Sequence, residues 1–197
     1  KTRSSAKAII KKMGCRIIKE TDQGPLYCAE VEMDFGDRFR RVGFITQERT
    51  NNNGVWLPEH HKAAIKAARG FAQLSIPVVT FMDTPGADAS EVANKGNQAH
   101  SISAIIAEMC NLEVPTVGII LGLGFSGGAI PLASTNVLLS VRDGVFNTIQ
   151  PKGLSGIARQ YNLSWQECAR YVGVSAYELY QQGNIDGIID YVPGESM

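Results

Sequence analysis

The chain has 197 residues, of which 44% are hydrophobic and 19% are charged, a composition typical of a globular protein with one core. Its 19 basic and 19 acidic residues cancel, so no overall field favours nucleic acid or an anionic membrane surface. No apolar run has the length of a membrane-spanning helix. The four cysteines are widely spaced and form no C-x-x-C pair, which argues against a zinc ribbon and favours free thiols in the cytoplasm. No metal site is predicted.

The N-terminal residues 1–24 are predicted to form a helical segment, followed by one α/β domain over residues 25–197. Within the segment, Ile9, Ile10, Met13 and Ile17 recur at helical spacing among basic residues. Alternating, then continuous, apolar runs predict the strands of the domain, and Pro58 marks the start of a helix. The predicted strands are 25–33, 39–46, 77–82, 116–121, 136–141 and 145–149, with helices from residue 58 and over 96–111.

The chain is organised around residues 115–135, where an apolar strand leads into glycines 122, 124, 127 and 128 and then into small residues. This pattern predicts a buried strand, a tight turn and the start of a helix. Glycine lets a ligand approach the main chain, and the first N–H groups of a helix have no internal acceptor. The stretch is therefore predicted to hold an oxyanion or a phosphate.

Four interpretations compete for these glycines. Gly122, Gly124 and Gly127 match the dinucleotide fingerprint, and Asp143 lies near the expected distance, but Pro131 would interrupt the long helix that the fingerprint needs. Residues 124–128 also match the nucleophile elbow G-x-S-x-G, but all three histidines lie upstream, in the wrong order for such a hydrolase. The third interpretation is an oxyanion hole without a nucleophile, which we favour over the fourth, a turn that only packs closely.

The oxyanion interpretation assigns backbone donors on two turns. Gly86 and Ala87, after the strand at 77–82, would act with Gly127 and Gly128, so these four residues are the predicted catalytic set. Asp83, Asp88 and Ser126 are interpreted as turn and cap residues. The pair His60 and His61 is interpreted as polar side chains on the surface and not as a metal site, because no third ligand accompanies it.

Several motifs in order resemble the α-type carboxyltransferase subunit of bacterial acetyl-CoA carboxylase. They are DTPGA at 83–87, KGNQ at 95–98, VPTVGIILGLGFSGGA at 114–129, IQPKG at 149–153 and GNIDGIID at 183–190. The resemblance implies the crotonase (ClpP-like) fold, a spiral of ββα units with a helical C-terminal tail. It also implies transfer of CO2 from carboxybiotin, on a carrier protein, to the α-carbon of an acyl-CoA. It further implies a homo- or hetero-oligomer with a β-type carboxyltransferase subunit or domain.

The resemblance also implies the residues that contact the cofactor and the CoA thioester. These are Gly122, Gly124, Phe125, Ser126, Lys152 and Gly153. Two of these positions, and Leu123 between two of them, depart from the family pattern. Leu123 and Phe125 stand where the family tends to have glutamate and glycine, and Lys152 stands where it usually has glutamate. Two alternatives to carboxyl transfer stay open: a malonyl-thioester decarboxylase subunit, and a CoA-binding or assembly lobe without activity.

A crotonase-type hydratase is disfavoured. Such an enzyme has one glutamate shortly after its glycine run and a second in a Q-P-E segment, but this chain has Ile130 or Pro131 and Lys152 at these places. After Gly153 the sequence predicts helices over 154–160, 164–171 and 175–182 and a short strand around Ile188. The resemblance implies that this tail packs on a neighbouring lobe.

Overall fold

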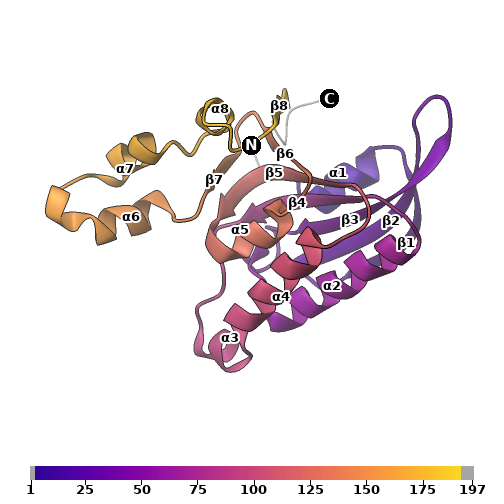
Figure 1. Ribbon diagram of the computed structural model, residues 1–197, viewed down its shortest axis with the longest axis horizontal. Coiled ribbons are helices and arrows are strands. Elements are labelled where there is room, and N and C mark those ends of the chain that lie inside the picture. Colours follow the sequence, from indigo (N-terminus) through magenta and orange to yellow (C-terminus); the bar gives the residue numbers. More distant parts are fainter. Residues whose placement is uncertain (1–2, 192–197) are drawn as a thin grey trace.

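The structure is a computed structural model that describes residues 3–191, and it is built on one eight-stranded sheet (Figure 1). The predicted α/β class is confirmed. The strands are β1 Arg16–Asp22, β2 Leu26–Asp34, β3 Phe39–Gln47, β4 Val78–Thr84, β5 Thr116–Phe125, β6 Val137–Val141, β7 Val145–Asn147 and β8 Gly187–Ile189.

Helices follow the strands along most of the chain. The α-helices are α1 Ala6–Lys12, α2 Pro58–Gln73, α3 Glu91–Lys95, α4 Gln98–Cys110, α5 Ser126–Ala133, α6 Pro151–Ile157, α7 Trp165–Val172 and α8 Ala176–Gln181. Two short 3-10 turns, η1 Asn52–Gly54 and η2 Arg159–Tyr161, complete the elements. Among the described residues, no helix has the length and apolar character needed to cross a bilayer.

The sheet changes from antiparallel to parallel pairing at β3. Strands β1, β2 and β3 form an antiparallel meander in which Tyr27 pairs with Thr46. From β3 onward the neighbours β4, β5, β6 and β8 are parallel, and β7 pairs with the end of β5. Because β3, β4 and β5 run in the same direction, their C-terminal ends meet at one edge of the sheet.

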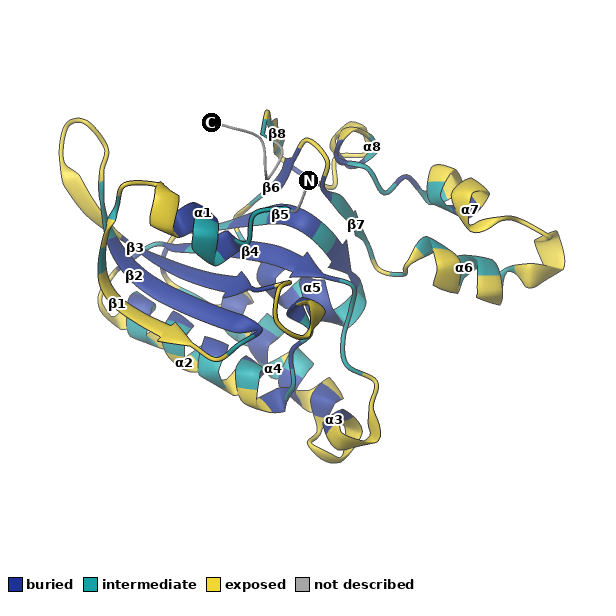
Figure 2. Ribbon diagram, turned by 180° about the vertical axis from the view of Figure 1, so that it is seen from behind, coloured by how far each residue is buried: buried dark blue, intermediate teal, exposed yellow. Residues whose placement is uncertain are grey.

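Two apolar clusters hold the layers together. Helices α2, α4 and α5 cover one face of the sheet and α1 covers part of the other (Figure 1). Trp56, Phe71, Met82 and Ile105 belong to the cluster under the covering helices, and Tyr27 and Phe81 to the cluster next to α1. Strands β2 to β5 are accordingly buried over most of their length (Figure 2). The continuous apolar run at 77–82 is explained by coverage on both faces.

The prediction of a helical N-terminal segment is right for Ala6–Lys12 and wrong for Arg16–Asp22. Gly14 has a left-handed φ of 69°, which ends the helical path. The following residues form β1, in which Ile17 pairs with Val31. The apolar spacing was compatible with a helix, but pairing with an existing strand determined the outcome. Residues 192–197 of the predicted domain lie outside the described part of the chain.

The predicted tight turn at Gly122 and Gly124 is also wrong, because β5 continues through both glycines to Phe125. Strand β7 pairs with β5 at Leu123–Phe125, so this stretch has a strand partner of its own. The change of direction comes one step later, at Ser126, where α5 begins. The elements predicted at 25–33, 39–46, 58, 77–82 and 96–111 are confirmed within a few residues.

The predicted tail helices are confirmed and two of them have a capping box. Ser164 caps α7 with Glu167, and Ser175 caps α8 with Glu178. Helices α6 and α7 form an arm, residues 151–172, that projects away from the sheet (Figures 1 and 2). No residue of α6 is buried, and in α7 only Cys168 is.

His61 is buried rather than on the surface, at 1% exposure. Its Nδ1 lies 2.8 Å from the Ser101 hydroxyl, and burial lowers its pKa to about 4. The imidazole is therefore neutral at physiological pH. It belongs to the packing between α2 and α4, and among the described residues no cluster of metal-capable side chains includes it.

Glu48, at the end of β3, makes the stability of the fold depend on pH. It is 2% exposed and accepts a hydrogen bond from the backbone N–H of Lys7, and burial raises its pKa. A carboxyl group whose pKa is raised in the folded state stabilises the fold most when the pH is below its pKa in the unfolded chain, about 4.3. This stabilisation is lost as the pH rises through the pKa of the folded state.

We therefore expect Glu48→Gln to raise the melting temperature relative to the wild-type chain more at pH 7 than at pH 4. The amide keeps an acceptor for Lys7 and carries no charge to desolvate. Thermal unfolding between pH 4 and 8 measures this difference. Glu113→Gln, at an exposed position, is the matched control. A constant difference across the pH range would contradict the prediction.

Candidate functional site

The predicted catalytic residues lie at the edge where β3, β4 and β5 end. Gly86 and Ala87 follow β4, and Gly127 and Gly128 form the first turn of α5, which follows β5. Because β4 and β5 are parallel neighbours, the two segments leave the sheet side by side. We call residues 84–88 the β4 turn and residues 125–128 the β5–α5 turn.

The two turns are in direct contact. A Cβ built on Gly128 would lie 2.4 Å from the carbonyl carbon and oxygen of Gly86 and 2.8 Å from the nitrogen of Ala87. A Cβ on Gly127 would lie 4.0 Å from the Cβ of Ala87. The structure therefore brings all four predicted catalytic residues together. Position 128 requires glycine because the Gly86–Ala87 peptide fills the space that a side chain there would need. The close approach is made by the chain's own backbone and not by a ligand.

The junction offers backbone donors without acceptors. Among the described residues, the Ala87 N–H has no hydrogen-bond acceptor. The N–H groups of Gly127 and Gly128 belong to the first turn of α5, where the helix itself supplies no acceptor. Ala87 and Gly127 are half-exposed, so a ligand can reach this side of the junction. Backbone N–H groups without acceptors on two adjacent turns are of the kind that stabilise an oxygen that gains negative charge.

Ser126 is not the cap that we predicted. The N-cap of α5 is Phe125, which makes no side-chain cap hydrogen bond. Ser126 is the first helical residue and has a left-handed φ of 58°, which is uncommon for a residue with a Cβ. Among the described residues, no histidine forms a hydrogen bond with its hydroxyl. A Ser–His pair of the hydrolase type is therefore not assembled.

Three residues predicted to contact the cofactor face the protein interior. A Cβ on Gly122 would lie 2.5 Å from Oδ1 of Asp83, and one on Gly124 would lie 2.7 Å from Cδ2 of Phe146. The side chain of Phe125 is buried, with 6% exposure. These two glycines make room for the chain's own side chains, which gives them a packing role in the site.

Lys152 and Gly153 begin the arm and lie beside the site. Both are exposed in α6, and the Nε2 of Gln150, the N-cap of α6, donates to the carbonyl oxygen of Pro85. This hydrogen bond connects the base of the arm to the β4 turn. Lys152 and Gly153 thus follow, by two and three residues, a side chain that contacts the β4 turn, on an element that continues away from the body.

Two side chains that contact the β5 strand and the β5–α5 turn were missed or only partly recognised from the sequence. Asp83 was interpreted as a turn residue, but its carboxylate is 5% exposed, accepts a 3.0 Å hydrogen bond from the N–H of Leu123 and contacts Arg49. Gln47 lay just outside the strand predicted at 39–46, but it ends β3 and its Nε2 donates to the carbonyl of Gly128 at 2.7 Å. The sequence signal that could have identified them is their position, because Gln47 and Asp83 are polar residues at the ends of the apolar strands β3 and β4.

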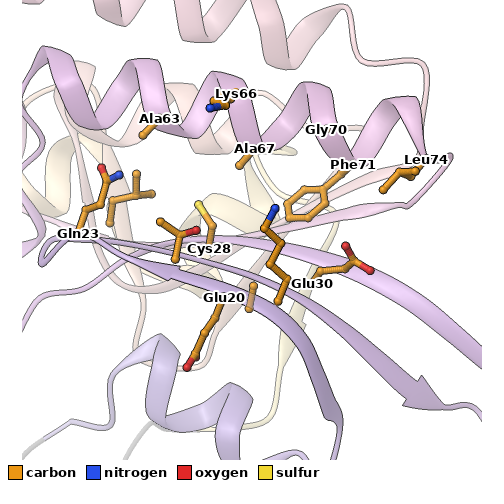
Figure 3. A pocket seen from close by; sticks show the side chains of 14 residues that line it. Glu20, Gln23, Cys28, Glu30, Ala63, Lys66, Ala67, Gly70, Phe71 and Leu74 are labelled. Atoms are coloured by element: carbon orange, nitrogen blue, oxygen red, sulfur yellow. The ribbon is translucent and has the colours of Figure 1, made fainter.

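A cavity of about 380 Å³ lies elsewhere, between α2 and the strands β1 and β2 (Figure 3). Cys28, Ala67 and Phe71 contribute to its apolar lining, and Lys19 and Lys66 contribute cationic side chains. None of its lining residues belongs to the β4 turn or the β5–α5 turn. Within residues 3–191, no three His, Cys, Asp or Glu side chains form a group suited to a metal ion.

The amino-acid sequence of this chain matches the model of a known protein family. Residues 40–196 match the model of the family described as acetyl co-enzyme A carboxylase carboxyltransferase-like. The chain belongs to this family. The match includes both turns of the junction and the arm.

Curated relatives have the same family name. The chain is 34% identical over 148 residues to an acetyl-coenzyme A carboxylase carboxyl transferase subunit alpha of Coxiella burnetii, covering 75% of this chain and 47% of that protein. It is 32% identical over 153 residues to the subunit of that name from Fusobacterium nucleatum, covering 77% and 49%. The chain therefore spans about half the length of the curated relatives that it matches.

Solved structures confirm the predicted crotonase-type carboxyltransferase fold. A transcarboxylase 12S structure, with hydrolysed methylmalonyl-coenzyme A bound, superposes with a TM-score of 0.76 at 15% identity, covering 84% of this chain and 32% of that one. A single-chain, multi-domain long-chain acyl-CoA carboxylase gives 0.73 at 15% identity, covering 96% and 21%. At these identities the likeness concerns the fold alone.

Proposed function

We propose that this chain is a carboxyltransferase lobe of a biotin-dependent acyl-CoA carboxylase, which transfers CO2 from carboxybiotin to the α-carbon of acetyl-CoA or a related acyl-CoA. The observation that carries the proposal is the contact between the β4 turn and the β5–α5 turn, with Gly128 packed on the Gly86–Ala87 peptide. Family membership supports the same reaction class.

The role of the chain in this reaction is to stabilise negative charge on oxygen. Removal of a proton from the α-carbon of a thioester, with the biotin ring that has given up CO2 as the proton acceptor, places charge on the thioester oxygen. The N–H groups of Ala87, Gly127 and Gly128 would stabilise this charge until the α-carbon forms its bond to CO2. One such donor typically contributes about 3 kcal/mol to transition-state stabilisation. No nucleophilic side chain is needed.

The donor set also suits a bound carboxybiotin, which supplies the CO2. Its ring carries a polar carbonyl oxygen, and backbone N–H groups recognise such an oxygen without introducing charge. The half-exposed Ala87, Ser126 and Gly127 would hold this group, with Lys152 and Gly153 at the rim.

We also propose that the lobe works with a β-type carboxyltransferase partner and a biotin carrier protein. The arm supports this assignment, since it begins at the site and exposes large apolar side chains. Ile157, Tyr161 and Tyr171 are 74%, 67% and 86% exposed. Aromatic side chains of this kind are enriched at protein interfaces. A partner that docks on the arm would therefore lie directly beside the junction.

The test is to assay the chain together with candidate β-type partners and a carboxylated carrier protein. Formation of a carboxylated acyl-CoA that depends on the carrier supports the proposal. Release of CO2 from malonyl-CoA without any carrier would assign the chain to the decarboxylase alternative. Binding of acyl-CoA with neither reaction would assign it to a non-catalytic assembly lobe.

A further inference from the structure

The geometry of the β5–α5 turn is not determined by α5 itself. The helix has eight residues, its first residue is in the left-handed region, and its N-cap makes no side-chain hydrogen bond. Pro131 lies inside the helix and has no N–H, so the carbonyl of Gly127 lacks its usual partner four residues on. The geometry of a donor site on this turn therefore depends on contacts from other elements of the fold.

We infer that Gln47 and Asp83 are positioning residues for the proposed carboxyl-transfer reaction, because they fix the β5–α5 turn from the two neighbouring strands. This inference rests on the proposed function. Gln47 comes from the end of β3 and Asp83 from the end of β4. Neither side chain is placed against the substrate, and both act through the backbone of the turn.

Asp83 fixes the start of the turn. Its Oδ1 accepts the N–H of Leu123, and its carboxylate fills the space that a side chain at position 122 would need. Arg49 lies 3.4 Å from the same oxygen and provides the compensating charge for a carboxylate that is 5% exposed. The backbone before Phe125 is thus held against β4.

Gln47 fixes the end of the turn. It is 1% exposed, and its Nε2 donates to the carbonyl of Gly128 at 2.7 Å. Its Oε1 is buried and has no hydrogen-bond partner among the described residues. An unpaired buried amide oxygen destabilises the folded state. Fold stability alone would favour an apolar side chain here, so the residue is better explained by what its N–H group holds.

Thr80 provides a matched control within the same helix. It is fully buried in β4, and its hydroxyl donates to the carbonyl of Leu132 at 2.6 Å, near the C-terminal end of α5. Gln47 and Thr80 therefore make the same kind of hydrogen bond to opposite ends of α5. Only the Gln47 hydrogen bond is at the end of α5 that contains the proposed donors.

The experiment compares Gln47→Met and Thr80→Val in the full chain assembled with its partner. We expect Gln47→Met to lower kcat about tenfold or more, with KM for the acyl-CoA changed less than twofold and the melting temperature unchanged or raised. Thr80→Val is expected to lower the melting temperature and leave kcat unchanged. A wild-type kcat in Gln47→Met, or a kcat that falls equally in both variants, would overturn the inference.

Hydrogen exchange separates this inference from the proposed function, because it does not require activity. In the full chain, Gln47→Met is expected to speed amide exchange in peptides covering 125–129, and Thr80→Val is not. Unchanged exchange in Gln47→Met overturns the positioning role even if the assembly is active. Faster exchange with no activity in the wild-type assembly supports the positioning of the turn and refutes the proposed reaction.

Asp83 is tested by conservative rescue. Asp83→Ala removes the acceptor for the Leu123 N–H, whereas Asp83→Asn keeps an oxygen at that place. We expect kcat to fall about tenfold or more in the alanine variant and to recover most of this loss in the asparagine variant. Equal activity of the two variants would show that the acceptor does not position the turn.

Discussion

Replacing Gly128 by valine is expected to lower turnover at least 100-fold. A Cβ at this position would overlap the carbonyl group of Gly86, so the β4 turn and the β5–α5 turn must move apart. The proposed donors on the two turns would then be displaced relative to each other, and loss of a single such donor already costs roughly 100-fold to 1,000-fold in kcat. Steady-state turnover of the assembled enzyme, with circular dichroism to confirm folding, measures the effect.

Two substitutions next to Gly128 make this result specific. Gly127→Ala places its Cβ 3.5 Å from Ile102, an ordinary contact, so its melting temperature should stay near that of the wild type, and Gly128→Val should melt lower. Ser126→Ala removes only a hydroxyl and should cost about 1 kcal/mol or less in activation free energy. An inactive Ser126→Ala beside an active Gly128→Val would favour a serine nucleophile and contradict the oxyanion assignment.

The purified chain without a β-type partner is expected to show no carboxyl transfer, and activity should appear only on mixing. The proposed donors occupy one edge of the sheet, and the arm beside them exposes apolar side chains instead of covering the site (Figures 1 and 2). On the proposed function, closure of such a site, which excludes water and orients both substrates, is supplied by the β-type carboxyltransferase subunit or domain. Carboxyl-transfer assays of the chain with and without the partner check this.

The arm should carry this association. We expect Ile157→Ser combined with Tyr171→Ser to weaken partner binding at least tenfold, because two large exposed side chains lose their contacts. Leu74→Ser is the control, since Leu74 is 56% exposed at the end of α2, away from the arm. Calorimetric titration measures the affinities. Robust carboxyl transfer by the isolated chain, or full affinity in the double variant, would refute the proposed role of the arm.

The sequence by itself determined most of the local elements and the family. The continuous apolar run at 77–82 predicted β4, Pro58 marked the start of α2, and the stretches beginning at 164 and 175 predicted α7 and α8. Each of these signals depends only on residues that are close together in the sequence, so it can be recognised without the tertiary structure. The ordered motifs also resembled the family that the comparison found.

Only the tertiary structure decided what each glycine at the centre does. Gly122, Gly124 and Gly128 look alike in the sequence, but Asp83, Phe146 and Gly86 respectively occupy the space beside them. The tertiary structure also decided that residues 16–22 form a strand, because they pair with the antiparallel strand β2.

The same holds for the side chains that fix the turn. Gln47 lies 81 positions before the carbonyl that it binds, and Asp83 lies 40 positions before Leu123. Contacts of this range depend on which strands become neighbours, and no local pattern encodes that pairing. The polar ends of β3 and β4 acquire a role only when parallel pairing brings them to the same edge of the sheet.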